Sequence, residues 1–310
     1  MTSLDVRNAR GQLFVETSCM RGGKTQRLID IAERLKHSPH RCSAFTPTMN
    51  TRDGKTEIVS DQRHRYPAQA IDPQHPEEIV RIIAEQDSRG PYVDVVMLDE
   101  ANFYTPGLIG AIERLRRDQR RIVLIGGLNW DFRGEPFGPM GALIARADQI
   151  NVHRPYCQVQ TADRRRCQAL ASHTVRALRR GTFKNLDLEG ICFYENSDTE
   201  PQEGYCYAPY WHPTVQVEDP KSEEIKYTVT CAAHFKIVRR EETFHVEEAI
   251  QQAKRGISKE GLQKELKEIP DRDHILQFLL TERRIQEKRD RWQATLYQRD
   301  PRSAMPIPYS

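Results

Sequence analysis

The sequence predicts an α/β protein: a parallel sheet with helices on both faces, followed by a small cysteine-containing domain and a helical C-terminal extension. Three short apolar runs predict strands of the sheet, namely Leu13 to Val15, Val93 to Leu98 and Ile122 to Ile125. Continuous apolar runs are typical of strands that are buried on both faces. Segments with apolar residues at helical spacing alternate with these runs, and such alternation indicates a parallel sheet.

The first apolar run leads into a glycine-containing loop. Residues 18–25 read SCMRGGKT, and apolar residues recur at helical spacing from Leu28 to Leu35. A strand, a loop and a helix in this order surround an anion with backbone N–H groups and a helix N-terminus. We therefore expect a phosphate-binding loop, in which Lys24 reaches the β- and γ-phosphates and Thr25 binds Mg²⁺. Ser18 replaces the first glycine of the common G-x4-G-K-[ST] motif, so an ordinary turn before a helix is the alternative.

Two acidic residues follow the second apolar run. Asp99 and Glu100 come directly after Leu98, at the carboxyl end of a predicted strand, where ligands bind in open α/β sheets. An acidic pair at this place also occurs in ordinary ATPases and helicases, in which the glutamate activates water. The other elements expected in this domain are a short strand at Ala44 to Thr46 and helices at Pro76 to Gln86 and Leu108 to Leu115.

Two polar segments are candidates for loops beside the ligand. Asn50 to Gly54 is polar and prone to turns, which fits a loop beside a phosphate and equally any surface turn. Asp131 to Phe137 is interrupted by glycine and proline, yet it carries two aromatic residues and an arginine just after a strand. We expect it to form a lid over a pocket. A connecting loop whose aromatic side chains pack inward is the alternative.

The composition narrows the class of protein. The 310 residues include 47 Lys and Arg against 44 Asp and Glu, and the net charge of +3 neither requires nor excludes nucleic acid. The mean hydropathy of −0.71 indicates a solvated extension. No apolar stretch is long enough to cross a bilayer, and Met1 to Arg10 lacks the apolar core of a signal peptide, so we expect a cytoplasmic protein. In that compartment, seven cysteines are metal ligands or free thiols rather than a disulfide framework.

The character of the chain changes near His153. Five of the seven cysteines lie between His153 and Ala233, where helical patterns are few, and this indicates a small domain held by a metal. The stretch from about Arg239 to Gln298 is charged, with sparse apolar residues at helical spacing, and the residues after it include three prolines. We expect a nucleotide-binding domain at 11–152, a metal-binding domain at 153–238, a charged helical extension at 239–298 and a loose tail at 299–310.

Four segments in this order make the chain resemble the zinc-containing type II thymidine kinases over about residues 11–237. Residues 18–25 fit the family's loop S/G-x-M-x-x-G-K-[ST], including its serine variant. The acidic motif D-E-x-Q-F appears as residues 99–103, with Asn102 in place of the glutamine. Residues 127–137 closely match G-L-x-x-D-F-R-G-x-x-F, which common ATPases lack. The resemblance implies a P-loop kinase-like α/β domain that carries a zinc-stapled substrate-covering loop, the lasso.

The fourth segment implies the zinc site. In the family a C-x-x-C pair is followed by a C-x-x-[CH] pair, and Cys231 and His234 have the second spacing. An insertion separates the first pair here, so the implied ligands are Cys157, Cys167, Cys231 and His234. Cys192 and Cys206 are expected to be unliganded, and replacement of Cys157 by one of them is the alternative.

The resemblance also implies roles for individual residues. Glu100 would take the proton of the 5′-hydroxyl as general base, Arg52 would stabilise charge on the transferred group, and Lys24 would act on the phosphates. The residues expected to bind ATP and Mg²⁺ are Ser18, Met20, Gly22, Gly23, Lys24, Thr25 and Asp99. Those expected to surround the nucleoside are Met20, Phe103, Leu128, Phe132, Phe137, Thr174, Arg176 and Tyr227.

The implied reaction is phosphorylation of the 5′-hydroxyl of a pyrimidine deoxynucleoside, most simply thymidine, by ATP with Mg²⁺ and a structural Zn²⁺. A homo-oligomer, a dimer or a tetramer, is expected, and neither a membrane nor nucleic acid is required. Ser222 and Glu223 replace the glycine pair of the lasso, so a kinase for another nucleoside is one alternative. A DNA-associated ATPase and a binding protein that has lost activity are the others.

Overall fold

The computed structural model describes residues 8–49, 56–182, 188–195, 200–213, 223–252, 257–258, 261–262, 269, 272–281, 285–288 and 291–294. The chain forms two compact units. The first comprises residues 1–176, 192–203 and 227–235, and the second comprises residues 177–191, 204–226 and 236–310. None of the described helices is long and apolar enough to span a membrane.

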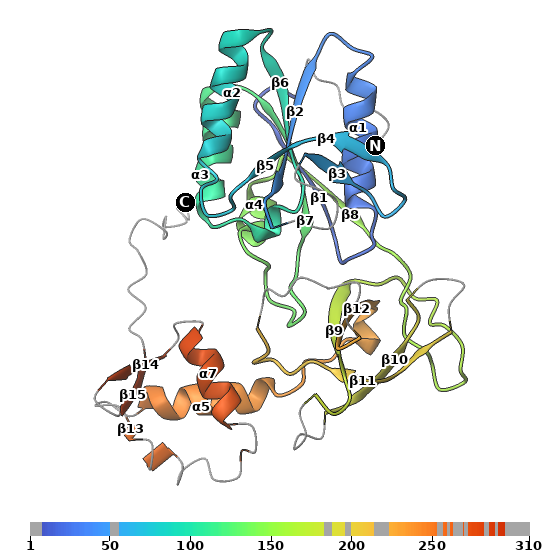
Figure 1. Cartoon of the computed structure of the whole chain (residues 1–310), viewed down its shortest axis with the longest axis vertical. Helices are drawn as coiled ribbons and strands as arrows, with labels where there is room; N and C mark the ends of the chain where they lie inside the picture. Colours follow the sequence, from blue (N-terminus) through green and yellow to red (C-terminus); the bar gives the residue numbers. More distant parts are fainter. Residues whose placement is uncertain are drawn as a thin grey trace, which may run out of the picture. The chain divides into compact units, whose positions relative to one another are not determined.

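The first unit is built on a six-stranded sheet in the order β5-β2-β6-β7-β1-β8 (Figure 1). Its strands are β1 (Leu13–Ser18), β2 (Arg41–Pro47), β5 (Gln69–Ile71), β6 (Val93–Leu98), β7 (Ile122–Leu128) and β8 (Gln149–His153). All neighbouring strands are parallel. After β1 the chain crosses over to β2 in one direction, and after β7 it crosses to β8 in the other. The carboxyl ends of β1 and β7 therefore flank the switch point at which ligands bind in open α/β sheets.

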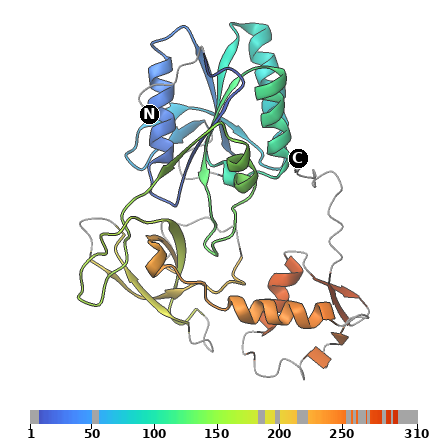
Figure 2. The same ribbon diagram turned by 180° about the vertical axis from the view of Figure 1, so that it is seen from behind.

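Helices cover both faces of this sheet, as the sequence predicts (Figures 1 and 2). They are α1 (Lys24–Leu35), α2 (Glu78–Arg89), α3 (Gly107–Glu113) and α4 (Met140–Arg146). On one face, Leu28 and Ala32 of α1 belong to a buried core with Met97 and Leu124 of the central strands. On the other face, residues of α2, α3 and α4 form a second core with the alternate side chains of the same strands. The two cores explain why the central strands are apolar at every position.

Several short elements of this unit were not predicted. The strands β3 (Glu57–Val59) and β4 (Arg65–Pro67) form an antiparallel pair, and Ile58 and Tyr66 in them join the core beneath α1. Helix α2 begins two residues after the predicted start, because Pro76 and Glu77 form the turn that precedes it. A short helix at Ala101–Phe103 and a π-helix at Arg114–Asp118 complete this part of the chain. Strands of three residues carry too few side chains for an alternating pattern to be recognised.

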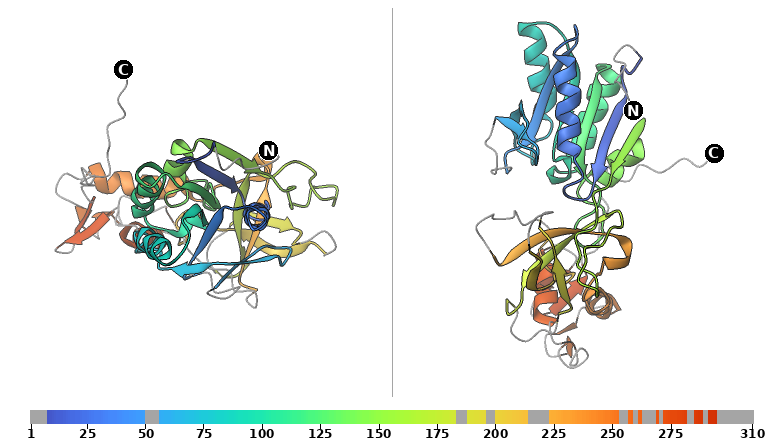
Figure 3. Two further views of the ribbon diagram at one scale, coloured as in Figure 1. Left: turned by 90° about the horizontal axis from the view of Figure 1, so that it is seen from above. Right: turned by 90° about the vertical axis from the view of Figure 1, so that its right-hand side faces the viewer.

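The cysteine-containing region forms a second sheet in the order β10-β11-β9-β12 (yellow-green to orange in Figure 3). Its strands are β9 (His173–Arg179), β10 (Gly190–Phe193), β11 (Gln202–Tyr207) and β12 (Ile225–Thr230), and a short helix at Ala232–His234 follows. The division into two units runs through the strands of this sheet.

The C-terminal part contains strands as well as the expected helices. Helices α5 (Arg240–Gln252) and α7 (Arg272–Thr281) share a buried core in which Val246, Ile275 and Leu279 are fully enclosed. A three-stranded antiparallel sheet in the order β13-β15-β14 was not predicted; its strands are β13 (Ile257–Ser258), β14 (Ile285–Lys288) and β15 (Arg291–Ala294). The predicted tail at 299–310 lies outside the described residues. The domain boundaries drawn from the sequence stay predictions.

Candidate active site

The loop between β1 and α1 has the backbone geometry that a phosphate-binding loop needs. A Cβ atom on Gly22 would lie 1.8 Å from Oγ of Ser18, so only glycine fits beside that serine. Gly23 has a φ of 82° and caps the N-terminus of α1, a left-handed conformation that costs glycine little. The local sequence thus turns the chain sharply from the strand into the helix, and the N–H groups of the first helical turn face the loop.

Three residues predicted to act on phosphate and Mg²⁺ lie together beneath this loop. Lys24 is buried, and its Nζ donates to the backbone oxygen of Cys19 at 3.2 Å. Asp99, at the end of β6, is also buried, and its carboxylate is hydrogen-bonded to Thr25 and lies in the field of Lys24. Strand β1 with α1 supplies two of these groups and β6 supplies the third, as the topology of a parallel sheet allows.

The carboxyl group of Asp99 has an unusual environment. Burial, followed by the negative charge of Glu100, raises its pKa from 3.8 to about 7, although the hydrogen bond from Thr25 and the charge of Lys24 act in the opposite direction. Its Oδ1 atom is buried and has no hydrogen-bond partner among the described residues. A buried, unpartnered carboxylate oxygen beside a threonine hydroxyl offers the oxygen ligands that Mg²⁺ prefers.

Glu100 follows Asp99 in a left-handed conformation, with φ of 51° and ψ of 41°. This conformation is uncommon for a residue with a Cβ. It ends β6, so Glu100 leaves the regular alternation of the strand and stands at the start of the Ala101–Phe103 helix. Unlike Asp99, its side chain is only partly buried.

Asn102 joins the ends of two neighbouring strands. Its Oδ1 accepts a hydrogen bond of 2.9 Å from the backbone N–H of Leu128, the last residue of β7. The asparagine side chain is therefore long enough to reach the end of β7, although it is shorter than the glutamine of the family motif. Gly138, with φ of 54°, passes so close that a Cβ there would lie 2.2 Å from the backbone oxygen of Asn102. The motif thus fixes the loop after β7 against the end of β6.

The predicted aromatic residues form two contacts near these strand ends. The rings of Phe103 and Phe137 meet edge to face with centroids 5.5 Å apart. The guanidinium of Arg176 lies 4.2 Å from the ring centroid of Phe132, and its Nε donates to the hydroxyl of Tyr227 at 2.8 Å. Burial lowers the pKa of Arg176, and the nearby Tyr227 and Asp131 oppose that shift. Phe132 and Phe137 are both buried.

The sequence analysis gave Asp131 and Arg133 no individual role within the expected lid, yet they organise the segment after β7. Oδ1 of Asp131 accepts from the backbone N–H groups of Arg133 and Glu135, at 2.8 and 3.0 Å. Its Oδ2 accepts from Nε of Arg133 at 2.9 Å, and both side chains are buried. An aspartate that binds backbone N–H groups two and four residues later is a turn signal, and it could have been found from the Asp-x-Arg-Gly spacing.

Thr174 and Met20 connect the phosphate loop with the cysteine-containing region. The backbone N–H of Met20 donates to Oγ1 of Thr174 at 2.9 Å, and Thr174 is buried. Arg21, with φ of 57°, donates to the backbone oxygen of Glu195. Strand β9 and the segment after β10, both distant in sequence, therefore contact the loop directly.

Four predicted metal ligands come together at one point. The ligand atoms of Cys157, Cys167, Cys231 and His234 all lie within 4.8 Å of one another. Nδ1 of His234 is 3.5 Å from both Sγ of Cys157 and Sγ of Cys231. Zinc bonds of 2.3 Å to sulfur and 2.0–2.1 Å to nitrogen at tetrahedral angles would separate these atoms by about 3.6 Å. The cluster therefore has the donor set and the spacing of a tetrahedral metal site.

Without a cation, the surroundings of Cys157 favour its neutral thiol. Burial, with a smaller contribution from the charges of Cys231 and Cys167, raises the pKa of Cys157 from 9.0 to about 12. A bound cation reverses that effect, because thiolates are the species that bind it. Cys192 and Cys206 lie outside this cluster: their Sγ atoms contact Oε1 of Gln160 at 3.1 Å and the backbone oxygen of Leu178 at 3.4 Å.

Two predicted positions lie outside the described residues, namely Arg52 in its polar loop and Ser222 in the lasso. Glu223 is described. Its backbone oxygen and its Oε2 both accept from the hydroxyl of Tyr205 at 3.0 Å, and this hydrogen bond lowers the pKa of Glu223.

Comparison with known proteins gives the family. The chain matches the family model described as thymidine kinase over residues 11–185. A thymidine kinase of Bacteroides thetaiotaomicron is 33% identical over 198 residues, which cover 64% of this chain and 87% of the relative. A thymidine kinase of Porphyromonas gingivalis is 29% identical over 220 residues, or 71% of this chain and 93% of the relative. The chain therefore belongs to the thymidine kinase family.

Proposed function

We propose that the protein transfers the γ-phosphoryl group of ATP to the 5′-hydroxyl of thymidine. The observation that carries the proposal is the convergence of Lys24, Thr25 and the buried carboxylate of Asp99 below one glycine loop. Family membership supports the nucleoside as acceptor. Phosphoryl transfer is mainly a matter of positioning and charge neutralisation, and these groups supply both.

The phosphate loop would hold the triphosphate. Backbone N–H groups from Ser18 to Gly23 other than that of Met20, which donates to Thr174, would bind its oxygens together with the ammonium of Lys24. The hydroxyl of Thr25 and the carboxylate of Asp99 would hold Mg²⁺, which neutralises charge on the phosphates when it is bound. The unpartnered Oδ1 of Asp99 fits this role, because a buried carboxylate oxygen without a partner is otherwise unfavourable.

Glu100 would act as general base on the 5′-hydroxyl. Its left-handed backbone ends the regular alternation of β6, and its charge acts on Asp99, so the two carboxyl groups lie near each other. The partial exposure of Glu100 leaves it accessible to an acceptor hydroxyl, whose proton it would take. Arg52 would stabilise charge on the transferred group.

The nucleoside would bind between the phosphate loop and the two aromatic contacts described above. Rings of Phe103, Phe132, Phe137 and Tyr227 would pack on the base and the sugar, since aromatic rings bury large apolar surfaces. Met20, Leu128, Thr174 and Arg176 would complete the enclosure. Replacement of the lasso glycines by Ser222 and Glu223 favours a base site that accepts nucleosides besides thymidine.

The Cys/His cluster would hold one structural Zn²⁺. All four positions of a tetrahedron are filled by protein atoms, which leaves no open position for a substrate or water. Its role would be to fix the chain around Tyr227, four residues before Cys231, against the rest of the unit. A homo-oligomer remains a prediction from the family resemblance, and a cytoplasmic location remains a prediction from the apolar pattern of the sequence.

The test is direct phosphorylation. Purified protein would be incubated with labelled ATP, Mg²⁺ and a panel of nucleosides, without DNA, and the monophosphates would be separated. We expect thymidine monophosphate to form. ATP hydrolysis that requires DNA, without a labelled nucleotide product, would contradict the proposal and favour a DNA-associated ATPase. Nucleoside binding without turnover would instead indicate a protein that has lost activity.

A further inference from the structure

One edge of the parallel sheet is only partly covered. Strand β2 pairs with β6 from Arg41 to Phe45, whereas β5 pairs with β2 only from Phe45 to Pro47. Among the described residues, no strand pairs with Arg41 to Ala44 on the side away from β6. An edge of this kind presents unpaired backbone N–H and C=O groups, and these can bind another extended chain.

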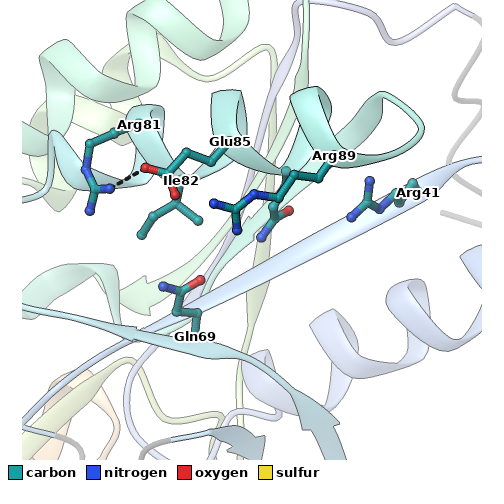
Figure 4. Close-up of a pocket in the computed structure, with 7 residues that line it drawn as sticks. Arg41, Gln69, Arg81, Ile82, Glu85 and Arg89 are labelled. Carbon is teal, nitrogen blue, oxygen red and sulfur yellow. Dashed lines mark hydrogen bonds and ion pairs between the residues drawn. The ribbon is translucent and has the colours of Figure 1, made fainter.

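Two cavities flank this uncovered edge. The first has a volume of about 360 Å³ and lies between α2 and the starts of β2 and β5 (Figure 4). The second has a volume of about 380 Å³ and is bounded by Lys36, by β2 from Arg41 to Ala44, and by the chain around Tyr66. Ile82 in the first cavity belongs to the core under α2, and Tyr66 in the second belongs to the core under α1. Arg41, Gln69 and Gln86 line both cavities, so the two meet at the edge, and from there the first extends toward the α2 face and the second toward the α1 face.

The first cavity is positively charged. Arg41, Arg81 and Arg89 line it with a single acidic residue, Glu85, and Figure 4 shows Glu85 paired with Arg81. Arg89 and the amides of Gln69 and Gln86 have no hydrogen-bond partner among the described residues. These donors face a cavity that is large enough for two or three side chains of a bound segment.

The second cavity is different in character. Its lining includes Cys42, Ala44, Tyr66, Pro67 and Ala68, and its charged residues, Lys36 and Arg41, are both basic. The ammonium of Lys36 lies 4.9 Å from the ring centroid of Tyr66 and pairs with Glu33 at 2.6 Å. Small aliphatic side chains would fit this more apolar wall, whereas acidic ones would suit the first cavity.

We propose that this edge binds an extended segment of a partner protein whose residues alternate between acidic and aliphatic. Added along Arg41 to Ala44, the segment would form backbone hydrogen bonds with the edge of β2. Side chains of a strand point alternately to opposite faces, so every second residue would enter the arginine-lined cavity and the others would enter the cavity beside Tyr66. The alternation is thus a consequence of the two cavities extending toward opposite faces.

Charged side chains also protect sheet edges from unwanted pairing. Protection requires only that Arg41 and its neighbours repel or obstruct another strand. It does not require cavities on both faces or unpartnered amides beside the arginines. The two explanations differ in what they predict for an acidic, alternating peptide: binding in the first case and exclusion in the second.

The experiment uses fluorescence anisotropy with the full chain and a labelled, capped peptide, Glu-Val-Glu-Val-Glu-Val. There are three control peptides. The first has Lys in place of Glu, the second has the same composition in the order Glu-Glu-Glu-Val-Val-Val, and the third is the alternating peptide with N-methyl groups at alternate backbone positions. We expect the alternating acidic peptide to bind at least tenfold more tightly than each control. The N-methylated peptide keeps every charge, so its loss of binding would identify backbone pairing.

Two variants test the cavity. R81E/R89E should weaken binding of the peptide at least tenfold, and the milder R81Q/R89Q should weaken it severalfold. Arg114→Glu, at an exposed arginine outside both cavities, is the matched control and should change binding less than twofold. Thermal unfolding would show that each variant is folded. Equal binding of the four peptides would overturn the proposal, and so would peptide binding that R81E/R89E leaves unchanged. A third contrary result combines two observations: pyrophosphate displaces the peptide completely, and the N-methylated peptide binds as well as the unmethylated one. That result would indicate a site for small anions.

Discussion

The phosphate loop and the Cys/His cluster differ in how the chain brings their residues together. The loop motif uses eight consecutive residues, from the last residue of one strand to the second residue of the next helix, and its shape depends on close contacts such as that between Ser18 and Gly22. The cluster joins Cys157 and Cys167 to Cys231 and His234, which lie more than sixty residues later. The loop is therefore a product of local geometry, and the cluster is a product of tertiary structure.

The comparison predicts which substitutions affect chemistry and which affect folding. The loop is supported by a sheet with two apolar cores, so its functional groups can be changed without loss of the fold. In the cluster, Cys157 and Cys231 are buried and Cys167 is partly buried, and a bound cation would make their thiolate forms favourable together. Loss of a ligand there should damage structure first.

The largest expected effect is that of Glu100→Gln. Removal of the general base should lower kcat by about 10²- to 10⁴-fold while ATP still binds, because amide and carboxylate have nearly the same shape. Turnover and ATP affinity would be measured by product formation and calorimetry, with the exposed Glu77→Gln as control. Near-normal turnover would remove Glu100 from the mechanism. The zinc content should stay that of the wild type.

Lys24→Ala should weaken both ATP binding and turnover, by about 10²- to 10³-fold in kcat/KM, because it removes the positive charge nearest the β- and γ-phosphates. Lys36→Ala, in the turn after α1, is the matched control and should keep full activity. An unchanged ATP affinity in Lys24→Ala would contradict the assignment of the loop. A large fall in the unfolding midpoint of Lys24→Ala would contradict the expectation that substitutions in the loop affect chemistry rather than folding.

Cys231→Ser should reduce the zinc content from one ion per chain to a small fraction and lower the unfolding midpoint, because one of four ligands is lost. Metal analysis and thermal unfolding would measure both quantities. Cys192→Ser and Cys206→Ser are matched controls, since their sulfur atoms contact other groups. Equal zinc in Cys231→Ser and the wild type would exclude the site, and loss of zinc in Cys192→Ser or Cys206→Ser would add that cysteine to the ligand set.

Asn102→Ala should lower the free energy of unfolding by about 1–3 kcal/mol, the cost of leaving a partly buried N–H at Leu128 without an acceptor. Denaturant unfolding would measure this. Asn102→Asp keeps an acceptor oxygen at the same distance along the side chain, so its free energy of unfolding should fall less than that of Asn102→Ala. If both variants are equally destabilised, the hydrogen bond to Leu128 is not the cause.

The smallest expected effect concerns the base. Ser222→Gly with Glu223→Gly should increase the preference for thymidine over other pyrimidine nucleosides by about tenfold, since one hydrogen bond to the base contributes about 0.5–1.5 kcal/mol. Competition assays of kcat/KM across the nucleoside panel would test it. The idea is wrong if thymidine is by far the best substrate of the wild type and the double variant has the same kcat/KM for thymidine. The lasso would then bind the base by other contacts.

Much of the α/β unit could be predicted because its determinants are local. Continuous apolar runs predicted β6 and β7, helical spacing predicted α1 and α2, and the consecutive motif from Ser18 to Thr25 predicted the phosphate loop. The short strands β3 and β5 could not be predicted, since three residues give no period and their stability comes from neighbours. The C-terminal strands β14 and β15 were read as helix for a related reason: charged residues with sparse apolar positions fit either structure.

By itself, then, the sequence determined the alternation of the main strands and helices and the glycine loop at residues 18–25, because each depends on residues close together in the chain. Only the tertiary structure decided that Asn102 reaches Leu128, that Asp131 holds Arg133, and that four ligand atoms lie within 4.8 Å of one another. It also decided that the edge of β2 lies open between two cavities. Such contacts join distant segments, and their geometry depends on how whole strands and helices pack, which no local pattern of residues specifies.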